Sequence, residues 1–354
     1  MRIFLSVTSV DPDYGGPAVS VPSLAKALAE LGEQVGLWAP DGSVGTTMIS
    51  DGVMRLSGPF KEALDRFGRP DFIHDNGVWL RHNHAIALAA KRARVPRVVT
   101  PRGMLEPWAF SYKPLKKRIA FALYQKRDLA SAALLHATAE NEAQALARFG
   151  FDVPIRVVPN GMELPHLERA PAEPSGERIA LFLSRVHPKK GLPMLIEAWA
   201  ALRPKDWRLV IAGPEELGHA AELEALAAKL GLSKEISLVG PQYGADKASL
   251  FARADLFVLP TYSENFGMAV AEALAHEVPV LTTTGAPWED LLTHRCGWWV
   301  APTPDGVREG LRAALASNET ERRAMGERGR ALIADAYGWD RIARRMVEMY
   351  RELT

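Results

Sequence analysis

Two basic and two acidic residues in the second half of the chain have the types and spacing needed to bind a sugar diphosphate. Arg185 and Lys190 stand five residues apart on either side of a turn, and Glu264 precedes Glu272 with seven residues between them. Arginine binds a phosphate through two parallel hydrogen bonds and lysine adds a point charge, so the pair suits a diphosphate. Carboxylates accept hydrogen bonds from hydroxyl groups, as in sugars. A solvated basic turn and a solvated helix glutamate are the plain structural alternatives, so neither motif alone decides the function.

A third loop of interest carries Gly15 and Gly16 directly before an expected helix. The first N–H groups of a helix can bind an anion, and glycines let it approach the backbone. A tight turn with Pro17 at the first helical position is the alternative. The loop lacks the G-x-G-x-x-G pattern, which disfavours a nicotinamide-dependent dehydrogenase. Asp13 lies in this loop, but no metal site is predicted there because Pro12 constrains the neighbouring aspartates.

The elements that must position these loops alternate between short β-branched runs and longer amphipathic stretches. This alternation predicts βαβ units and doubly wound parallel sheets. The expected strands of the first half are Arg2–Thr8, Gln34–Ala39, Asp71–His74, Arg97–Thr100, Ala133–Thr138 and Ile155–Pro159. The pattern restarts after a linker rich in proline and glycine, with strands at Arg178–Ser184, Trp207–Ala212, Glu235–Val239, Leu256–Leu259, Pro279–Thr282 and Gly297–Val300. Ligands bind outside the carboxyl ends of parallel strands, which is where the candidate loops fall.

The pattern predicts an N-terminal domain over residues 1–165, a C-terminal domain over residues 166–338, and a helix over residues 339–354 that can return to the first domain. The chain has 354 residues, a formal net charge of +1 and one cysteine, Cys296, so an internal disulfide is excluded. Its apolar runs are shorter than the roughly 18–20 residues of a membrane span. We expect a cytoplasmic protein, and the near-zero net charge disfavours a general nucleic-acid binder.

Taken in order, these loops resemble glycosyltransferase family four, whose members are retaining enzymes of the GT-B fold. The resemblance rests on the Gly15-Gly16 loop, on V-P-N-G ending at Gly161, on S-R-V-H-P-K-K-G at Ser184–Gly191 and on E-N-F-G-M-A-V-A-E at Glu264–Glu272. It implies an α/β protein with two Rossmann-like doubly wound domains facing a central cleft. It also implies transfer of a sugar from a nucleotide diphosphate donor, with retained anomeric configuration and without a cofactor or metal.

The resemblance assigns roles to individual residues of the donor site. Arg185 and Lys190 would bind the diphosphate, Glu264 the sugar hydroxyls and Glu272 the ribose. Backbone amides would assist at the sugar and phosphates; they belong to Asn265, Phe266, Gly267 and Met268. The backbone of Val239 and Gly240 would face the base, and Gly15 and Gly16 would approach the diphosphate from the other domain.

One position departs from the family pattern. Many members carry histidine in the loop where this chain has Arg102, within the sequence P-R-G-M-L. Arginine stays protonated at neutral pH and is no base, but it could stabilise developing negative charge, so Arg102 joins the catalytic candidates. The P-R-G-M-L loop resembles members that build surface polysaccharide or lipopolysaccharide. On the acceptor side, the candidates are Asp13, His74, Asn76, Trp79 and His136.

The segment 91–127 is strongly basic, with eleven lysines and arginines against one acid, Glu106. Aromatic residues are interleaved, a composition typical of elements that bind a membrane surface. We therefore expect this segment to contact an anionic membrane and to face a glycan or lipid-linked sugar acceptor at its inner face. The alternative is a solvated helix whose apolar residues pack inward, namely Leu115, Ile119, Ala122 and Leu123. Nucleic acid is not expected, because no nucleic-acid-binding motif accompanies the segment.

Two other functions remain open at this stage. One is a catalytically inactive partner protein that binds a nucleotide sugar, and the other is another GT-B enzyme such as a nucleotide-sugar epimerase or a phosphorylase. The R-x4-K and E-x7-E motifs disfavour the inactive protein and the epimerase, and no lysine context typical of pyridoxal phosphate supports a phosphorylase.

Overall fold

The computed structural model describes residues 1–11, 14–45, 48–107, 114–167 and 176–353. The chain forms two compact units, one of Met1–Gly161 with Trp339–Thr354 and one of Met162–Gly338. The division falls slightly before the expected boundary at residue 165. Its place is explained by Gly161, where a Cβ would lie 2.3 Å from the Trp339 ring, so the returning chain packs directly on this glycine.

The first unit contains an eight-stranded sheet in the order β3-β4-β2-β1-β5-β6-β7-β8. All neighbouring pairs are parallel except β3 with β4. The strands are β1 (Arg2–Ser6), β2 (Gln34–Trp38), β3 (Met48–Ser50), β4 (Val53–Leu56), β5 (Phe72–Asn76), β6 (Arg97–Thr100), β7 (Leu134–Ala137) and β8 (Ile155–Val157). The six strands expected from the sequence are present, whereas the short strands β3 and β4 at one end of the sheet were not foreseen.

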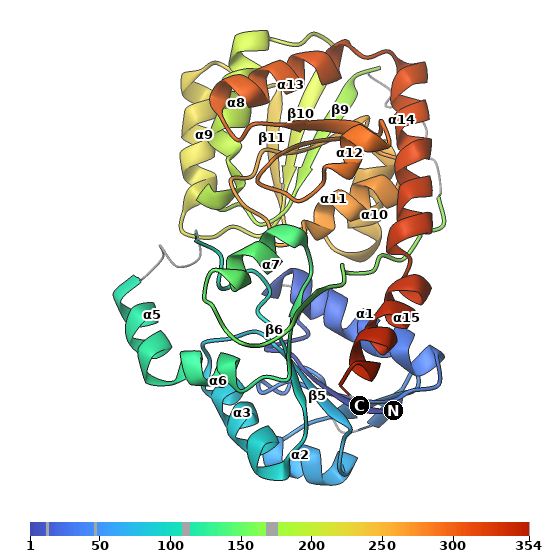
Figure 1. Ribbon diagram of the computed structural model, residues 1–354. Coiled ribbons are helices and arrows are strands. Elements are labelled where there is room, and N and C mark those ends of the chain that lie inside the picture. Colours follow the sequence, from blue (N-terminus) through green and yellow to red (C-terminus); the bar gives the residue numbers. More distant parts are fainter. Residues whose placement is uncertain (12–13, 46–47, 108–113, 168–175, 354) are drawn as a thin grey trace. The chain divides into compact units, whose positions relative to one another are not determined.

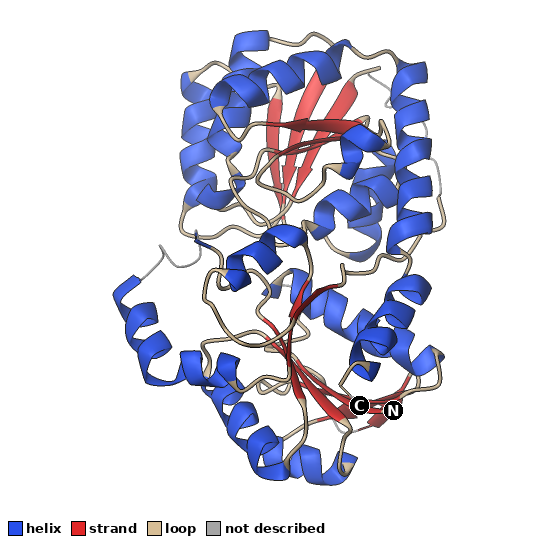
Figure 2. Cartoon of the chain, in the orientation of Figure 1, coloured by secondary structure: helices blue, strands red, loops and turns tan. Residues whose placement is uncertain are grey.

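Helices flank this sheet (Figure 2). They are α1 (Gly16–Glu30), α2 (Phe60–Phe67), α3 (Arg81–Ala93), α5 (Pro114–Ala120), the π-helical turn η2 (Phe121–Gln125), α6 (Lys126–Ala130), α7 (Glu140–Ala147) and α15 (Trp339–Arg351). Figure 1 shows α15, the last helix of the chain, beside α1. Its apolar face, including Ile342, Met346 and Tyr350, is buried in the same core as Leu5 of β1 and Leu24 of α1. The C-terminal helix is thus a part of the first unit.

The second unit contains a fully parallel six-stranded sheet in the order β11-β10-β9-β12-β13-β14. Its strands are β9 (Arg178–Leu183), β10 (Trp207–Ala212), β11 (Ile236–Gly240), β12 (Leu256–Leu259), β13 (Val280–Thr283) and β14 (Gly297–Val300). Its helical elements are η3 (Pro188–Lys190), α8 (Leu192–Leu202), α9 (His219–Lys229), α10 (Gly244–Arg253), α11 (Met268–Ala275), α12 (Asp290–Thr293), α13 (Pro304–Ala316), α14 (Glu319–Leu332) and η4 (Ile333–Tyr337).

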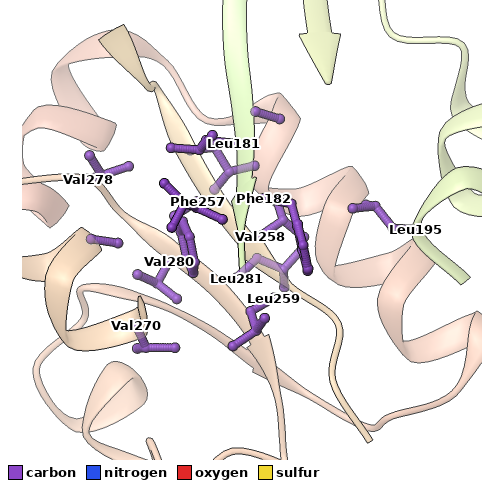
Figure 3. Close-up of a cluster of buried hydrophobic side chains, with 14 of the residues drawn as sticks. Leu181, Phe182, Leu195, Phe257, Val258, Leu259, Val270, Val278, Val280 and Leu281 are labelled. Carbon is purple, nitrogen blue, oxygen red and sulfur yellow. The ribbon is translucent and has the colours of Figure 1, made fainter. Parts of the chain in front are cut away.

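The core of the second unit lies between this sheet and its helices. Figure 3 shows side chains of β9, β12 and β13 meeting Leu195 of α8 and Val270 of α11. The strands are apolar on both faces, as expected for a parallel sheet covered by helices on both sides. Both units are therefore Rossmann-like α/β structures, which confirms the fold predicted from the sequence.

Two glycines bring the loops at the carboxyl edge of the second sheet into close contact. At Gly191, which ends the turn after β9, a Cβ would lie 2.1 Å from the Pro260 carbonyl oxygen after β12. At Gly213, after β10, it would lie 1.9 Å from the Ser184 carbonyl oxygen. Any larger residue would push these loops apart, so the glycines hold the candidate site together.

Candidate active site

An almost buried ion pair joins two of the loops at the carboxyl edge of the second sheet. The Lys190 Nζ lies 2.6 Å from the Glu264 Oε1, and their side chains are 9% and 12% exposed. Lys190 ends the turn η3 after β9, and Glu264 lies in the loop between β12 and α11. The sequence predicted that both residues would sit at this edge, and the structure brings them into direct contact.

Hydrogen bonds around Glu264 fix the carboxylate in place. The Thr261 hydroxyl donates to the same Oε1 over 2.9 Å, and the Glu264 amide donates to the Gly285 carbonyl over 2.7 Å. The neighbouring Tyr262 amide donates to the Lys189 carbonyl over 2.9 Å, which ties the loop after β12 to the loop after β9. The carboxylate is therefore held before any ligand arrives.

Opposing influences set the charge of Glu264. Burial raises the pKa of its carboxyl group, but the Lys190 and Lys189 ammonium groups and the hydrogen bonds from Lys190 and Thr261 outweigh burial, so the pKa lies below its ordinary value. Glu264 is thus a carboxylate at neutral pH, able to accept hydrogen bonds from hydroxyl groups.

Arg185 is paired with a residue that the sequence analysis did not single out. Its Nη1 lies 2.6 Å from the Glu216 Oε1, and the two side chains are 44% and 37% exposed. Glu216 follows β10, and the His187 ring lies 3.9 Å from its second carboxylate oxygen. The arginine is exposed enough to exchange this partner for a phosphate.

Glu272, on α11, is also held by a cation that was not foreseen. The Lys247 Nζ of α10 lies 2.7 Å from the Glu272 Oε1. The side chains are 30% and 19% exposed, so the carboxylate is oriented while still facing solvent. No sequence signal identified Lys247 or Glu216, because both belong to helices or loops whose facing residues only the fold reveals.

The segment before α11 presents backbone rather than side chains. Gly267 has a φ of 83° and starts the helix, a conformation that favours glycine. The Phe266 side chain is buried against Trp288 and Tyr337, and its carbonyl accepts a hydrogen bond from the Trp288 Nε1 over 2.6 Å. The roles expected for the amides from Asn265 to Met268 stay predictions.

The carboxyl end of β11 also lies at this edge of the sheet. Val239 is 41% exposed, and Gly240 has a φ of 71°. The Gly213 amide donates to the Gly240 carbonyl over 2.8 Å, which holds this loop against the one after β10. An exposed backbone at this place is compatible with a base-binding role, which stays a prediction.

At the carboxyl edge of the first sheet, Arg102 is held by two carboxamides. The Asn76 Oδ1 accepts from the Arg102 Nε over 3.1 Å and from Nη2 over 2.7 Å, while the Asn160 Oδ1 accepts from Nη1 over 2.6 Å. Arg102 is only 9% exposed and has a φ of 58°. Burial lowers the pKa of its guanidinium to about 10, against the opposing influence of Glu142 and Tyr350, so it remains charged at neutral pH.

His74 and His136 lie in the core rather than on the surface expected for acceptor-binding residues. They are 0% and 3% exposed, and the Thr100 hydroxyl bridges them, 2.6 Å from the His74 Nε2 and 2.7 Å from the His136 Nδ1. The outer nitrogens reach the Tyr350 hydroxyl over 2.6 Å and the Val158 carbonyl over 2.7 Å. With every ring nitrogen engaged, these histidines tie α15 to the sheet.

The direction of these hydrogen bonds follows from the Val158 carbonyl, which can only accept. The His136 Nε2 must donate to it, so the Thr100 hydroxyl donates to the His136 Nδ1 and accepts from the His74 Nε2. The Tyr350 hydroxyl then donates to the His74 Nδ1. Burial lowers the pKa of both histidines, that of His136 to about 3, so both rings are neutral.

Three other candidates complete the edge of the first sheet. Gly15 has a φ of 86° and precedes α1, whose first turn carries no acidic residue and no side-chain cap. The Trp79 indole donates to the Met104 carbonyl over 3.1 Å and its amide donates to the Gln125 Oε1 over 2.7 Å, so this residue is anchored within its own unit. Asp13 lies outside the described residues.

The basic segment divides into internal and exposed residues. Arg97 is buried and lies 3.0 Å from Asp75, and Arg102 is the clamped arginine described above. On α5 and η2, however, Leu115, Ile119 and Leu123 are 72%, 51% and 67% exposed. The expectation that these three side chains pack inward is therefore wrong, and they form an outward apolar stripe at four-residue spacing. Basic residues lie between Leu115 and Ile119 and again after Leu123; they are Lys116, Lys117, Arg118, Lys126 and Arg127.

Two further searches concern metals and membrane spans. Within the described ranges, no group of three or more histidine, cysteine, aspartate or glutamate side chains is placed to hold a metal ion. None of the described helices is long and apolar enough to cross a membrane.

Two family models match the chain and together cover most of it. A glycosyl transferase 4-like domain matches residues 15–161, and the glycosyl transferases of group 1 match residues 165–332. The D-inositol 3-phosphate glycosyltransferase of Streptomyces bingchenggensis is 28% identical, over 96% of this chain and 85% of that protein. The enzyme of the same name from Salinispora tropica is also 28% identical, over 82% of this chain and 66% of that protein.

Solved structures show the same fold over the whole chain. Sucrose-phosphate synthase from Thermosynechococcus elongatus superposes with a TM-score of 0.79 at 20% identity, covering 100% of this chain and 99% of that one. Anabaena HepE, solved in complex with UDP and glucose, gives a TM-score of 0.75 at 19% identity, covering 99% and 100%. At such low identity, these likenesses concern the fold alone.

Proposed function

Because this chain belongs to the group 1 glycosyl transferases of GT-B fold, we propose that it transfers a sugar from a nucleotide diphosphate donor with retained anomeric configuration. The observation that carries the proposal is the Lys190–Glu264 pair, a cation and a carboxylate held together at the carboxyl edge of a parallel sheet. This is the place where such folds bind their ligands. Relatives and neighbours whose names mention a glycosyltransferase or UDP support the class of donor.

In this proposal, two basic and two acidic residues of the second unit each bind part of the donor. Arg185 leaves Glu216 and forms two hydrogen bonds with the diphosphate, while Lys190 donates to it from beside Glu264. The positive charges stabilise the diphosphate as its bond to the sugar breaks. Glu264 accepts hydrogen bonds from sugar hydroxyls, and Glu272, oriented by Lys247, accepts those of the ribose.

Retention follows if the acceptor attacks from the side on which the diphosphate leaves. The acceptor hydroxyl then forms the new bond to the anomeric carbon, and its proton passes to a departing diphosphate oxygen. No side-chain base is required for this step, in keeping with a buried arginine rather than a histidine at position 102.

A panel of nucleotide sugars tests the proposal. The matching donor should raise the Tm of the protein, because only a ligand that binds the folded state stabilises it. Release of nucleotide diphosphate with an acceptor present should follow for the wild type. Lys229→Ala and Glu224→Gln change exposed residues of α9 and serve as matched controls for substitutions at Lys190 and Glu264. If no nucleotide sugar stabilises the protein, the proposal fails.

The same assay separates the alternative functions. An inactive partner protein would show the Tm shift without any release of diphosphate, and an epimerase would convert the donor sugar without needing an acceptor. We also propose that the reaction needs no metal, so a chelator should leave the release of diphosphate unchanged. Loss of activity on chelation, restored by a divalent cation, would contradict this part of the proposal.

We further propose that the acceptor is a glycan or lipid-linked sugar of a surface polysaccharide, met at the inner face of a membrane. The outward stripe of Leu115, Ile119 and Leu123 among basic residues supports this, since such helices insert apolar side chains between anionic headgroups. Vesicles with anionic lipid should carry the protein on flotation, and zwitterionic vesicles should not. Ile119→Glu should abolish flotation, whereas Leu292→Glu, at an equally exposed leucine, should not. Equal flotation of both variants would refute the membrane contact.

A further inference from the structure

The guanidinium group of Arg102 is a buried charge whose direct partners are neutral. Its two hydrogen-bonding partners, Asn76 and Asn160, are carboxamides that are 2% and 8% exposed. Among the described residues, no carboxylate oxygen lies within ion-pair distance of Arg102. Removing such a charge from water is costly unless an anion compensates for it.

Glu142, whose charge raises the pKa of Arg102, does not fill this role. Glu142 influences Arg102 electrostatically, but its carboxylate is already used at both oxygens. Its Oε1 accepts from the Gly103 amide over 2.7 Å, and its Oε2 accepts from the Thr138 amide over 2.8 Å. Glu142 therefore shapes the loop that carries Arg102 rather than neutralising its guanidinium directly.

The Arg102 guanidinium has more N–H donors than its hydrogen bonds to Asn76 and Asn160 use. Arginine has five N–H groups, and the recorded hydrogen bonds use one on Nε, one on Nη1 and one on Nη2. One N–H on each terminal nitrogen has no partner among the described residues. Two such donors on one planar group suit the oxygens of a phosphate or carboxylate.

The position of Arg102 in the sheet strengthens this argument. The strand order places β5 between β1 and β6, and the direction of winding reverses between β1 and β5, the point at which doubly wound sheets bind ligands. Asn76 ends β5 and Arg102 follows β6, while Gly15 and Gly16 open α1 after β1. The start of α1, where the N-cap residue is Gly15, adds a second region of positive potential to the same edge.

We propose that Arg102 is the centre of an oxyanion site in the first unit, which binds a phosphate or carboxylate carried by the acceptor. Asn76 and Asn160 are positioning residues that hold the guanidinium without neutralising it. The proposal rests on the proposed glycosyltransferase function and narrows its acceptor to anionic molecules. It separates the anion of the acceptor from the diphosphate of the donor, which Arg185 and Lys190 bind in the second unit.

Calorimetric titration with inorganic phosphate, and in parallel with acetate, tests the site without any transfer reaction. We expect Arg102→Gln to weaken binding of the better anion at least tenfold, and Arg102→Lys to restore part of it. Arg185→Ala should keep this binding, which separates it from phosphate bound at the donor site. Binding that is unchanged in Arg102→Gln, or lost only in Arg185→Ala, would overturn the proposal.

A second variant keeps the test informative if Arg102→Gln does not fold. Asn160→Asp supplies a built-in carboxylate beside Nη1, so it should raise the Tm and weaken anion binding at least tenfold. Unchanged anion binding in Asn160→Asp would contradict the site. Nucleotide-sugar binding should be the same in Asn160→Asp as in the wild type, so a failed oxyanion site and a failed donor site give different results.

Discussion

The cations at the carboxyl edges of the two sheets have different kinds of hydrogen-bonding partner. In the second unit, Lys190, Arg185 and Lys247 each lie within 2.7 Å of a carboxylate oxygen. In the first unit, Arg102 is held by carboxamides, and the neighbouring histidines are neutral. The carboxyl edge of the second sheet is therefore charge-balanced, and in the proposed function its cations exchange partners when a diphosphate binds. The first edge is organised by neutral hydrogen bonds around one positive charge.

The largest effects on turnover and on the free energy of unfolding are expected at the nearly buried Lys190–Glu264 pair. Lys190→Ala should reduce the turnover number by about a thousandfold, because in the proposed function Lys190 is a cation that stabilises the departing diphosphate. It should also lower the free energy of unfolding by about 3–5 kcal/mol, since it leaves the Glu264 carboxylate buried without its partner. Steady-state kinetics and urea unfolding measure the two effects.

A double variant can separate the effect on turnover from the effect on the free energy of unfolding. Lys190→Met combined with Glu264→Gln removes both charges, so much of the lost stability should return while turnover stays low. Turnover in either variant that matches the Lys229→Ala control would refute the catalytic assignment of the pair.

The neutral histidines of the first edge predict a loss of stability in acid. Burial and nearby positive charge hold the pKa of both below the ordinary value, so below about pH 6.5 the unfolded chain takes up protons that the folded chain does not. Stability should therefore fall as the pH drops from about 6.5 towards 3, by about 1.4 kcal/mol per pH unit for each histidine. Urea unfolding at pH 7.5, 6 and 5 checks the slope, and constant stability over this range would contradict neutral rings.

A smaller loss of stability is expected at Tyr350, where the chain of buried hydrogen bonds through His74, Thr100 and His136 ends. Tyr350→Phe removes the hydroxyl that donates to the His74 Nδ1 and leaves a buried acceptor unsatisfied, which should cost about 1–3 kcal/mol of unfolding free energy. Tyr14→Phe, at a tyrosine that is 61% exposed, is the matched control and should change little. Equal free energies of unfolding for the two variants would show that the buried hydrogen bonds between Tyr350 and His74 do not hold α15 in place.

The smallest effect is expected at the exposed pair of the second edge. Glu216→Gln frees Arg185 from a competing carboxylate, so the KM for the donor should fall a few-fold with little change in kcat. The pair is more than a third exposed on both sides, which limits its strength. A higher KM would instead show that Glu216 orients Arg185 for the diphosphate.

Much of this arrangement could be predicted from the sequence, because alternating strands and helices specify the parallel sheets and place the loops at their carboxyl ends. The convergence of Lys190 and Glu264 followed from that edge and from the family resemblance. The partners Glu216 and Lys247 could not be found, since surface charges carry no periodic signal and meet only in the fold. The burial of His74 and His136 could not be predicted, because a histidine at a strand end looks the same in the sequence whether its neighbours are solvent or a tyrosine from a distant helix. The stripe of Leu115, Ile119 and Leu123 was visible, but periodicity does not say which way a stripe faces.

The proposed function requires that the charge-balanced edge of the second unit binds the diphosphate of a nucleotide sugar. Calorimetric titration of the nucleotide sugar that most raises the Tm, into the wild type, Arg185→Ala, Lys190→Ala and the Lys229→Ala control, tests it most directly. We predict that Arg185→Ala and Lys190→Ala each bind the nucleotide sugar at least tenfold more weakly than the wild type does. The Lys229→Ala control should bind it as well as the wild type. Wild-type affinity in both Arg185→Ala and Lys190→Ala would contradict the account.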